Sequence, residues 1–151
     1  MSGVSIKNLT SQHPKVVAGA VFSKIAKEVL PNWEISLVFV GSRKALELNK
    51  KLRGKNYVPN VLSYVVGNKS GEIIICLSEA KKQAPDFNLT PYTFTLYLFI
   101  HAVLHIKGWV HGANMDKCEQ KLLKRYETTH SNRDRHRHVP SKNGRRRGAL
   151  R

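Results

Sequence analysis

The segment that most constrains the fold of this chain is a long apolar helix in its second half. Residues 91–107 read PYTFTLYLFIHAVLHIK, with apolar side chains on most of the helix surface. Thr90 and Pro91 are typical of a helix start, because a capping side chain precedes a proline at the first helical position, and Gly108 is typical of a helix end. A helix that is apolar on most faces must be covered on several sides. We therefore expect it at the centre of one domain.

The rest of the chain to residue 126 mixes strands and helices. Apolar and β-branched runs predict four strands, at 4–9, 34–40, 60–66 and 72–77, and helical spacing predicts further helices, at 16–30, 42–52, 78–83 and 117–126. Ser42 is a plausible N-cap of one helix, and Asn114 or Asp116 of the last. GNKSG suits a hairpin loop between the last two strands. We predict a single α+β domain with a mostly antiparallel sheet of about four strands, helices packed on it and a central buried helix that carries histidines.

Composition bounds the class of protein. The chain has 151 residues, and 41% of them are hydrophobic, which suits one domain with its own core. Cys76 and Cys118 are in no C-x-x-C or zinc-finger spacing, which argues against a disulfide framework and fits a reducing compartment. The N-terminus shows no apolar signal-peptide core, and the apolar stretch 92–106 is too short to span a bilayer. We expect a soluble, cytoplasmic protein.

Charge points to the class of partner. Twenty-six Lys and Arg against ten Asp and Glu give a net charge of +16. Residues 133–151 hold eight of these cations and one acid, so both this tail and the preceding body are basic. A basic surface can serve solubility alone, but a surplus on both parts favours a polyanion. Nucleic acid suits it better than a membrane, because the tail has no apolar face. We predict a domain over 1–130 and a basic, flexible tail over 131–151.

The chemistry concentrates in HAVLHIKGWVH, residues 101–111. His101 and His105 are four residues apart, so both imidazoles lie on one helix face and can reach one metal ion. A continuous helix would turn His111 away, but a left-handed residue at Gly108 would bring the chain back. Two histidines alone would more often be packing; the glycine and the third histidine favour a ligand set. Three neutral histidines leave a fourth position for water, which is typical of catalytic zinc. We read the other histidines as solvated: His13, His130, His136 and His138.

The histidine motif lacks the base of a zinc protease. In H-E-x-x-H proteases a glutamate follows the first histidine and deprotonates the attacking water, whereas Ala102 stands here. The spacing is otherwise that of metzincin proteases, so a metalloprotease is kept as a less favoured alternative. A zinc ion can still lower the pKa of bound water towards neutrality. A phosphodiester substrate suits that nucleophile and a strongly basic protein better than a peptide does.

Two further segments accompany this motif: NKKLRGK (49–55) with NVLSY (60–64), and GEIIIC (71–76). Together with HAVLHIKGWVH they resemble the YbeY family of bacterial endoribonucleases, whose motifs read N-x-x-x-R-G-K, T-[DN]-V-L-S-F, G-D-I-x-I and H-G-x-L-H-L-x-G-Y-D-H. The segments occur in family order. The resemblance implies an α+β fold with one Zn²⁺ per chain in a cleft. It also implies a metal-dependent endoribonuclease specific for single-stranded RNA, acting at the 3′ end of small-subunit rRNA and in ribosome quality control.

The resemblance also implies roles for individual residues. Arg53 would be the catalytic arginine, with a guanidinium that holds the scissile phosphate and stabilises charge in the transition state. From the residues alone, Arg53 reads as an exposed arginine at a helix end. Ser63 either lines the cleft or belongs only to its strand, and Lys55 and Asn56 either contact substrate or are exposed loop residues. The implied partners are single-stranded ribosomal RNA and the small ribosomal subunit, with neither DNA nor a membrane.

The chain departs from the family pattern at several positions. Val110 replaces the aspartate before the third histidine and so removes a carboxylate expected to orient a ligand. Ala102 replaces a glycine, and Pro59 replaces a threonine. The helix after His111 is rich in lysine where the family tends to be acidic. A catalytically weak RNA- or ribosome-binding assembly factor is therefore the main alternative to a nuclease.

Overall fold

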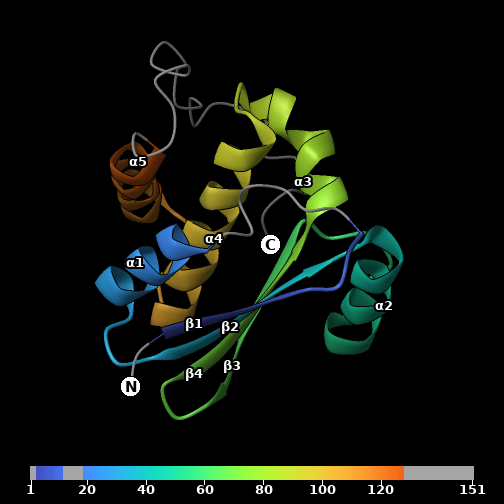
Figure 1. The fold of residues 1–151 in the computed structure, drawn as a ribbon, viewed down its shortest axis with the longest axis horizontal. Helices are drawn as coiled ribbons and strands as arrows, with labels where there is room; N and C mark the ends of the chain where they lie inside the picture. The colour runs from blue at the N-terminus through green and yellow to red at the C-terminus, as the bar shows by residue number, and fades with distance from the viewer. Residues whose placement is uncertain (1–2, 12–18, 128–151) are drawn as a thin grey trace.

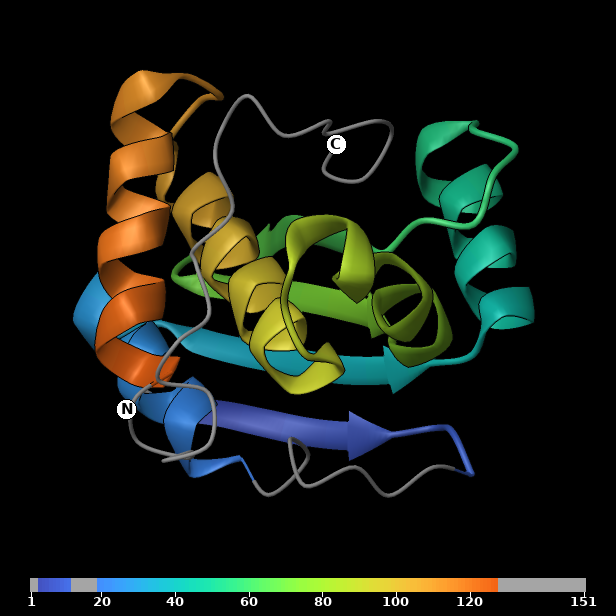
Figure 2. The same cartoon turned by 90° about the horizontal axis from the view of Figure 1, so that it is seen from above.

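The computed structural model describes residues 3–11 and 19–127. A four-stranded sheet carries helices on both of its faces (Figures 1 and 2). The sheet has the order β1-β2-β4-β3, and its strands are β1 (Gly3–Asn8), β2 (Glu34–Val40), β3 (Val61–Gly67) and β4 (Ser70–Cys76). The predicted α+β class, the single domain and the four strands are confirmed.

The prediction that the sheet is mostly antiparallel is wrong. β1 pairs in parallel with β2, and β2 pairs in parallel with β4; only β3 and β4 are antiparallel. The cause is connectivity, because a helix lies between β1 and β2 and another follows β2, and such crossovers join parallel strands. Gly67 pairs with Ser70, so the hairpin loop contains two residues instead of the predicted five.

The helices divide between the two faces of the sheet. The larger core lies under α1 (Ala20–Val29), α3 (Leu77–Gln83), the short 3-10 helix η2 (Ala84–Phe87), α4 (Pro91–Lys107) and α5 (Ala113–Glu127). A smaller cluster joins α2 (Ser42–Arg53) to the opposite face. In Figures 1 and 2, α2 accordingly stands apart from the other helices.

The central helix α4 is confirmed where it was predicted. Most of its residues, including Phe94, Phe99 and His101, are buried. Phe99 packs edge-on against Phe22 of α1, with ring centroids 4.9 Å apart, which is a favourable aromatic arrangement. At its start, the Thr90 hydroxyl accepts a hydrogen bond from the Thr93 backbone N–H at 3.1 Å. The helix that carries two of the three histidines is therefore held by the core along its length.

Other helix boundaries differ from the prediction. α2 begins at Ser42 itself, and Gly41 precedes it as the cap residue, so Ser42 is not an N-cap. α5 begins at Ala113, four residues earlier than predicted, so Asn114 and Asp116 lie inside it. The buried Met115 explains this early start, because it adds one more apolar contact to the inward face of the helix.

Several predictions concern residues outside the described part of the chain. They are the start of the first helix at 16–18, the basic tail at 131–151, and four histidines: His13, His130, His136 and His138. Within the described residues, no single helix has the length and apolar character needed to span a membrane. The segment Leu77–Phe87 and α4 have this length and apolar character only when they are taken together, and the chain bends by 101° between them.

Candidate metal centre

The three histidines of the motif lie together in space. The imidazole centroids of His101 and His105 are 4.4 Å apart, those of His105 and His111 are 4.5 Å apart, and those of His101 and His111 are 5.1 Å apart. One ligand nitrogen from each ring lies within 4.8 Å of the others. His101 is buried, His105 is half-buried and His111 is exposed. This group could hold one metal ion and leave it accessible from the side of His111.

The backbone at the end of α4 explains how the third histidine returns. Gly108 has φ +108°, in the left-handed region, as the sequence predicts. The Trp109 N–H donates to the Leu104 carbonyl at 3.0 Å, and the Gly108 N–H donates to the His105 carbonyl at 2.9 Å. This hydrogen-bonded ending reverses the direction of the chain after the helix. His111 therefore comes back beside the two helical histidines.

Gly108→Ala is expected to destabilise the fold and weaken metal binding. A side chain at Gly108 would meet no atom within 4 Å, so the penalty comes from the positive φ alone and should be about 1–3 kcal/mol. Relief of that strain would move His111 and raise the zinc dissociation constant. Urea unfolding and zinc titration measure both effects. Gly112→Ala is the matched control, because Gly112 has equal space and no positive φ. Equal effects of the two substitutions would contradict this explanation.

Two hydrogen bonds set the orientation of the His101 and His105 rings. His101 Nδ1 lies 3.0 Å from Glu119 Oε2, and both side chains are only 1% exposed. His105 Nδ1 lies 3.0 Å from the Trp109 carbonyl oxygen, which can only accept, so this nitrogen donates. Donation through Nδ1 leaves a lone pair on Nε2 of each ring, which is the form that a metal needs.

The remaining ring nitrogens fit a bound metal. Nε2 of His101 and Nε2 of His105 are buried, and neither has a hydrogen-bond partner in the described structure. A buried polar atom without a partner costs about 1–3 kcal/mol. An ion bound by the three histidines would satisfy both nitrogens at once. The donor set, three neutral imidazoles, suits zinc and other borderline metals.

Glu119 is the site residue that sequence reasoning missed. It lies on the inward face of α5, between the buried Met115 and Leu122. A carboxylate at such a position is rare without a partner, because burying an unpaired charge is costly. That position in the helix pattern was the signal available in the sequence. Val110, by contrast, is 79% exposed. The hydrogen bonds that orient His101 and His105 come from Glu119 and from the Trp109 carbonyl.

The surroundings of His105 favour its neutral form. Burial lowers the pKa of this imidazole, and the neighbouring His101 and His111 lower it further, against a weaker opposing effect of the Trp109 carbonyl. A lowered pKa means that the unfolded chain binds this proton more tightly than the folded chain does. The contribution of His105 to stability is therefore present above the unfolded pKa and is lost as the pH falls. The affinity for a metal ion should also decrease as the pH falls, because protons compete for the ligand nitrogens.

The other candidate residues come from different elements. Arg53 ends α2, and its Nη1 donates to the Tyr57 hydroxyl at 2.9 Å. Lys55 is exposed in the following loop. Ser63 is half-buried on β3, two residues after Val61, so it shares the strand face that α4 covers. Within residues 3–11 and 19–127, no hydrogen bond or ion pair joins these three to the histidines.

Figure 2 shows how the end of α2 lies relative to the connection from α4 to α5. Both are at the top of the picture, the end of α2 at the right and the connection at the left. Tyr57 is held at two points, because Asn49 Nδ2 donates to its carbonyl at 3.0 Å and Arg53 contacts its hydroxyl. Asn49 is fully buried, so this loop is fixed to α2.

A hollow of about 530 Å³ adjoins the exposed ligand. It is lined by the continuous segment 107–115, which includes His111 and the half-buried Trp109. The hollow gives a bound molecule room beside the third histidine.

Known proteins resemble this chain in sequence and in fold. The family model described as Endoribonuclease YbeY matches residues 4–132. A protein named Endoribonuclease YbeY from Spiroplasma citri is 32% identical over 119 residues, covering 69% of this chain and 74% of that protein. One from Sulfurihydrogenibium is 33% identical over 120 residues, covering 75% and 77%. The solution structure of a Thermotoga maritima protein has the same fold, with a TM-score of 0.66 at 22% identity, covering 95% and 99%. The chain therefore belongs to the YbeY endoribonuclease family.

Proposed function

We propose that this chain is a zinc-dependent endoribonuclease that hydrolyses phosphodiester bonds in single-stranded ribosomal RNA. Its expected place of action is the 3′ end of small-subunit rRNA, with a role in ribosome quality control. The observation that carries the proposal is the histidine group, in which two buried Nε2 atoms have no partner among the described residues. Membership of an endoribonuclease family supports RNA as the substrate.

The proposed metal site has three ligands and two groups that orient them. His101, His105 and His111 would hold the ion, and Glu119 and the Trp109 carbonyl keep two of the rings oriented. When bound, zinc supplies a Lewis acid and lowers the pKa of water enough to give a nucleophile at neutral pH.

Arg53 is the proposed phosphate ligand. Its guanidinium can donate two hydrogen bonds to a phosphate and so stabilise the charge that develops in the transition state. The hydrogen bond to Tyr57 limits the conformations of this exposed side chain before substrate binds. Lys55 and Ser63 are proposed to contact the same strand of RNA, Lys55 through its charge and Ser63 through its hydroxyl.

Cleavage of labelled RNA separates the three candidate functions. We expect chelator-sensitive cutting of single-stranded RNA, restored by zinc, and no cutting of a perfect duplex. Salt-sensitive RNA binding without cleavage at any divalent metal would favour the catalytically weak assembly factor. Chelator-sensitive cleavage of casein that His105→Ala abolishes would favour the metalloprotease. Ala102 is fully buried at the position of the protease base, which makes that last outcome the least expected.

Arg53→Lys is expected to lower kcat by about ten- to a hundredfold. This is a smaller decrease than the one expected when a hydrogen-bond donor to the transition state is removed completely. Lysine keeps the charge but cannot donate two parallel hydrogen bonds, so the loss should appear in kcat with zinc content unchanged. Arg43→Lys, at the other end of α2, is the matched control and should leave kcat unchanged. Equal kcat values for the two variants would remove Arg53 from the proposed mechanism.

A further inference from the structure

The strongest concentration of charge in the described chain lies on and just after α2. Between Ser42 and Lys55 there are six cations and one acid, Glu47. All of the cations are exposed: Arg43, Lys44, Lys50, Lys51, Arg53 and Lys55. For comparison, α1 and α5 together hold six cations and four acids over 25 residues.

Four of these cations form a stripe along the solvent face of α2. With 3.6 residues per turn, Arg43, Lys44, Lys50 and Lys51 project from one side of the helix, together with Glu47. The buried Ala45 and Asn49 point the opposite way, towards the sheet. We call the four cations the α2 stripe. It extends over about 12 Å of the helix axis, at 1.5 Å per residue.

Helix stability explains only half of the α2 stripe. Cations in the last turn interact favourably with the helix dipole, which accounts for Lys50 and Lys51. Arg43 and Lys44 are in the first turn, where the dipole disfavours positive charge and where no acid is present. Their presence there opposes the stability of the isolated helix, which points to an anionic partner.

Pairing inside the protein does not neutralise the stripe either. Lys44 lies 3.9 Å from Glu47, in an exposed ion pair of the kind that contributes little. Arg43, Lys50 and Lys51 make no ion pair with any described residue. Three charges of the stripe are thus available to a polyanion.

The C-terminal end of the stripe leads to Arg53, the proposed phosphate ligand, and then to Lys55. This end of α2 and the connection from α4 to α5 both lie at the top of Figure 2, the former at the right and the latter at the left. A strand of RNA cut at the histidines and held by Arg53 could therefore continue along α2 with its phosphates against the stripe.

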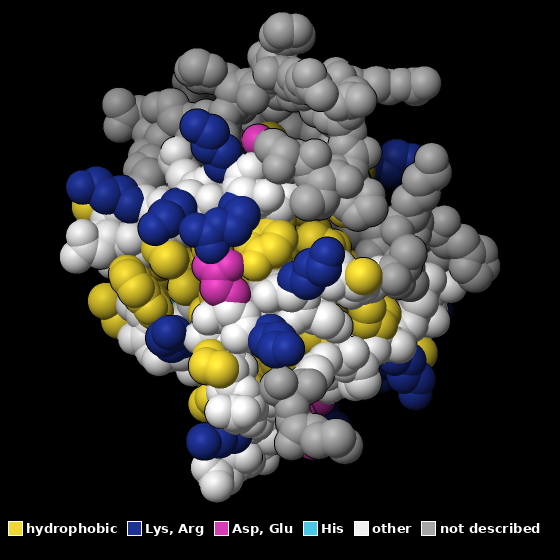
Figure 3. All heavy atoms as spheres, turned by 60° about the vertical axis from the view of Figure 1, so that its left-hand side comes forward, with side chains coloured by type: hydrophobic (Ala, Val, Ile, Leu, Met, Phe, Trp, Pro, Cys, Tyr) yellow, Lys and Arg dark blue, Asp and Glu magenta, His cyan; other side chains and the backbone are white. Residues whose placement is uncertain are grey.

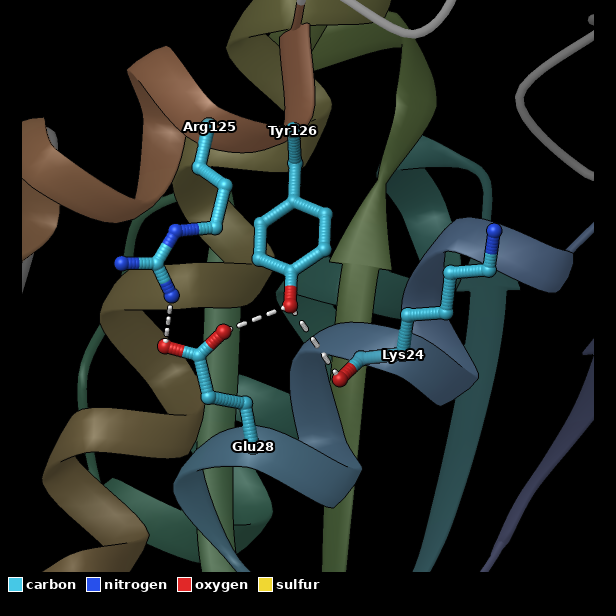
Figure 4. Close-up of polar contacts among 4 residues, drawn as sticks. All are labelled: Lys24, Glu28, Arg125 and Tyr126. Atoms are coloured by element: carbon cyan, nitrogen blue, oxygen red, sulfur yellow. Dashed lines mark hydrogen bonds and ion pairs between the residues drawn. The ribbon is translucent and has the colours of Figure 1, made fainter.

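The face formed by α1 and α5 is the competing surface. Figure 3 shows Lys and Arg side chains there, scattered among apolar ones. On α5, Arg125 donates to Glu28, which also accepts a hydrogen bond from the Tyr126 hydroxyl at 2.7 Å (Figure 4). Arg125 is thus used within the fold, to hold the end of α5 against α1. This face has neither the density nor the alignment of charge found on α2.

We propose that the α2 stripe binds the phosphates of the RNA strand that flanks the bond cleaved at the metal centre. The proposal rests on RNA being the substrate, and it adds an extended binding surface outside the cleavage site. Each phosphate neutralised by a cation releases condensed counterions, so the contribution of the stripe must depend on salt.

The test is the salt dependence of RNA binding by the zinc-loaded full chain. The variant Lys50→Gln/Lys51→Gln should bind a single-stranded RNA of about 16 nucleotides roughly tenfold more weakly at low salt. Its plot of log K against log salt should be less steep by about 1.4, which corresponds to two lost phosphate contacts. KM for this RNA should rise while kcat and zinc content stay unchanged. An RNA of about four nucleotides should be cut equally by both proteins, because it does not reach the stripe.

Three controls make the result specific. Lys81→Gln/Lys82→Gln removes another adjacent, exposed pair, on α3, and Lys121→Gln/Lys124→Gln removes a pair from the α1 and α5 face. Neither should change the slope, and Lys50→Arg/Lys51→Arg should keep the original slope. An unchanged slope for Lys50→Gln/Lys51→Gln, or an equal change in either control pair, would overturn the proposal. If the unaltered chain neither binds nor cuts RNA, the proposed function itself fails, and the two failures are thus distinguished.

Discussion

His105→Ala is expected to abolish stoichiometric zinc binding and to lower RNA cleavage by about 10³-fold or more. One of three ligands is lost, and the two that remain do not complete a site for zinc. Zinc per chain, measured by mass spectrometry of the purified protein, and the rate of cutting of labelled RNA report the two effects.

The exposed ligand provides a second variant that spares the core. His111→Ala removes a side chain at the surface, so the fold should stay intact while zinc is lost to a similar extent. His13→Ala, a histidine outside the motif, is the matched control and should keep both zinc and activity. Full activity of His111→Ala without zinc would show that cleavage does not depend on this group.

Glu119→Gln should weaken zinc binding by about tenfold, and Glu119→Ala by about a hundredfold. Glutamine can still accept the hydrogen bond from His101 Nδ1 but carries no charge, so it keeps the ring oriented and loses only the electrostatic support. Alanine leaves that nitrogen buried without a partner, which should also cost about 1–3 kcal/mol of unfolding free energy. Competition titration with a zinc chelator and urea unfolding measure the two quantities.

The graded response distinguishes orientation from a general loss of packing. Glu34→Gln removes an exposed carboxylate from β2 and should leave zinc affinity and stability unchanged. If both Glu119 variants bound zinc as the unaltered chain does, the contact between Glu119 and His101 would have no role in the metal site.

Local signals in the sequence predicted the parts of the fold that depend on few residues. The strand at 34–40 and the helix at 91–107 have the predicted bounds. Alternation of apolar residues marks the strand, and Thr90-Pro91 and Gly108 mark the ends of the helix; each of these signals depends on a few neighbouring residues. The left-handed conformation of Gly108 and the grouping of the three histidines followed from the same local reasoning.

The parts that were missed depend on tertiary contacts. Alternation shows which face of a strand is buried but not which strand lies beside it or in which direction, so the parallel pairing of β2 with β1 and β4 was not visible. Glu119 was missed for a related reason: its carboxylate becomes meaningful only once α5 packs against α4 and faces His101. The sequence analysis treated Val110 as the loss of an orienting carboxylate for the same reason, because the contact between Glu119 and His101 is not visible in the sequence.

X-ray absorption at the zinc edge of the zinc-loaded protein tests the central claim most directly. The histidine group predicts one zinc ion with three imidazole nitrogens at about 2.0–2.1 Å, one oxygen ligand from water and no sulfur. A sulfur shell at about 2.3 Å, or a zinc ion with fewer than three imidazoles, would contradict the assignment of His101, His105 and His111 as the metal ligands.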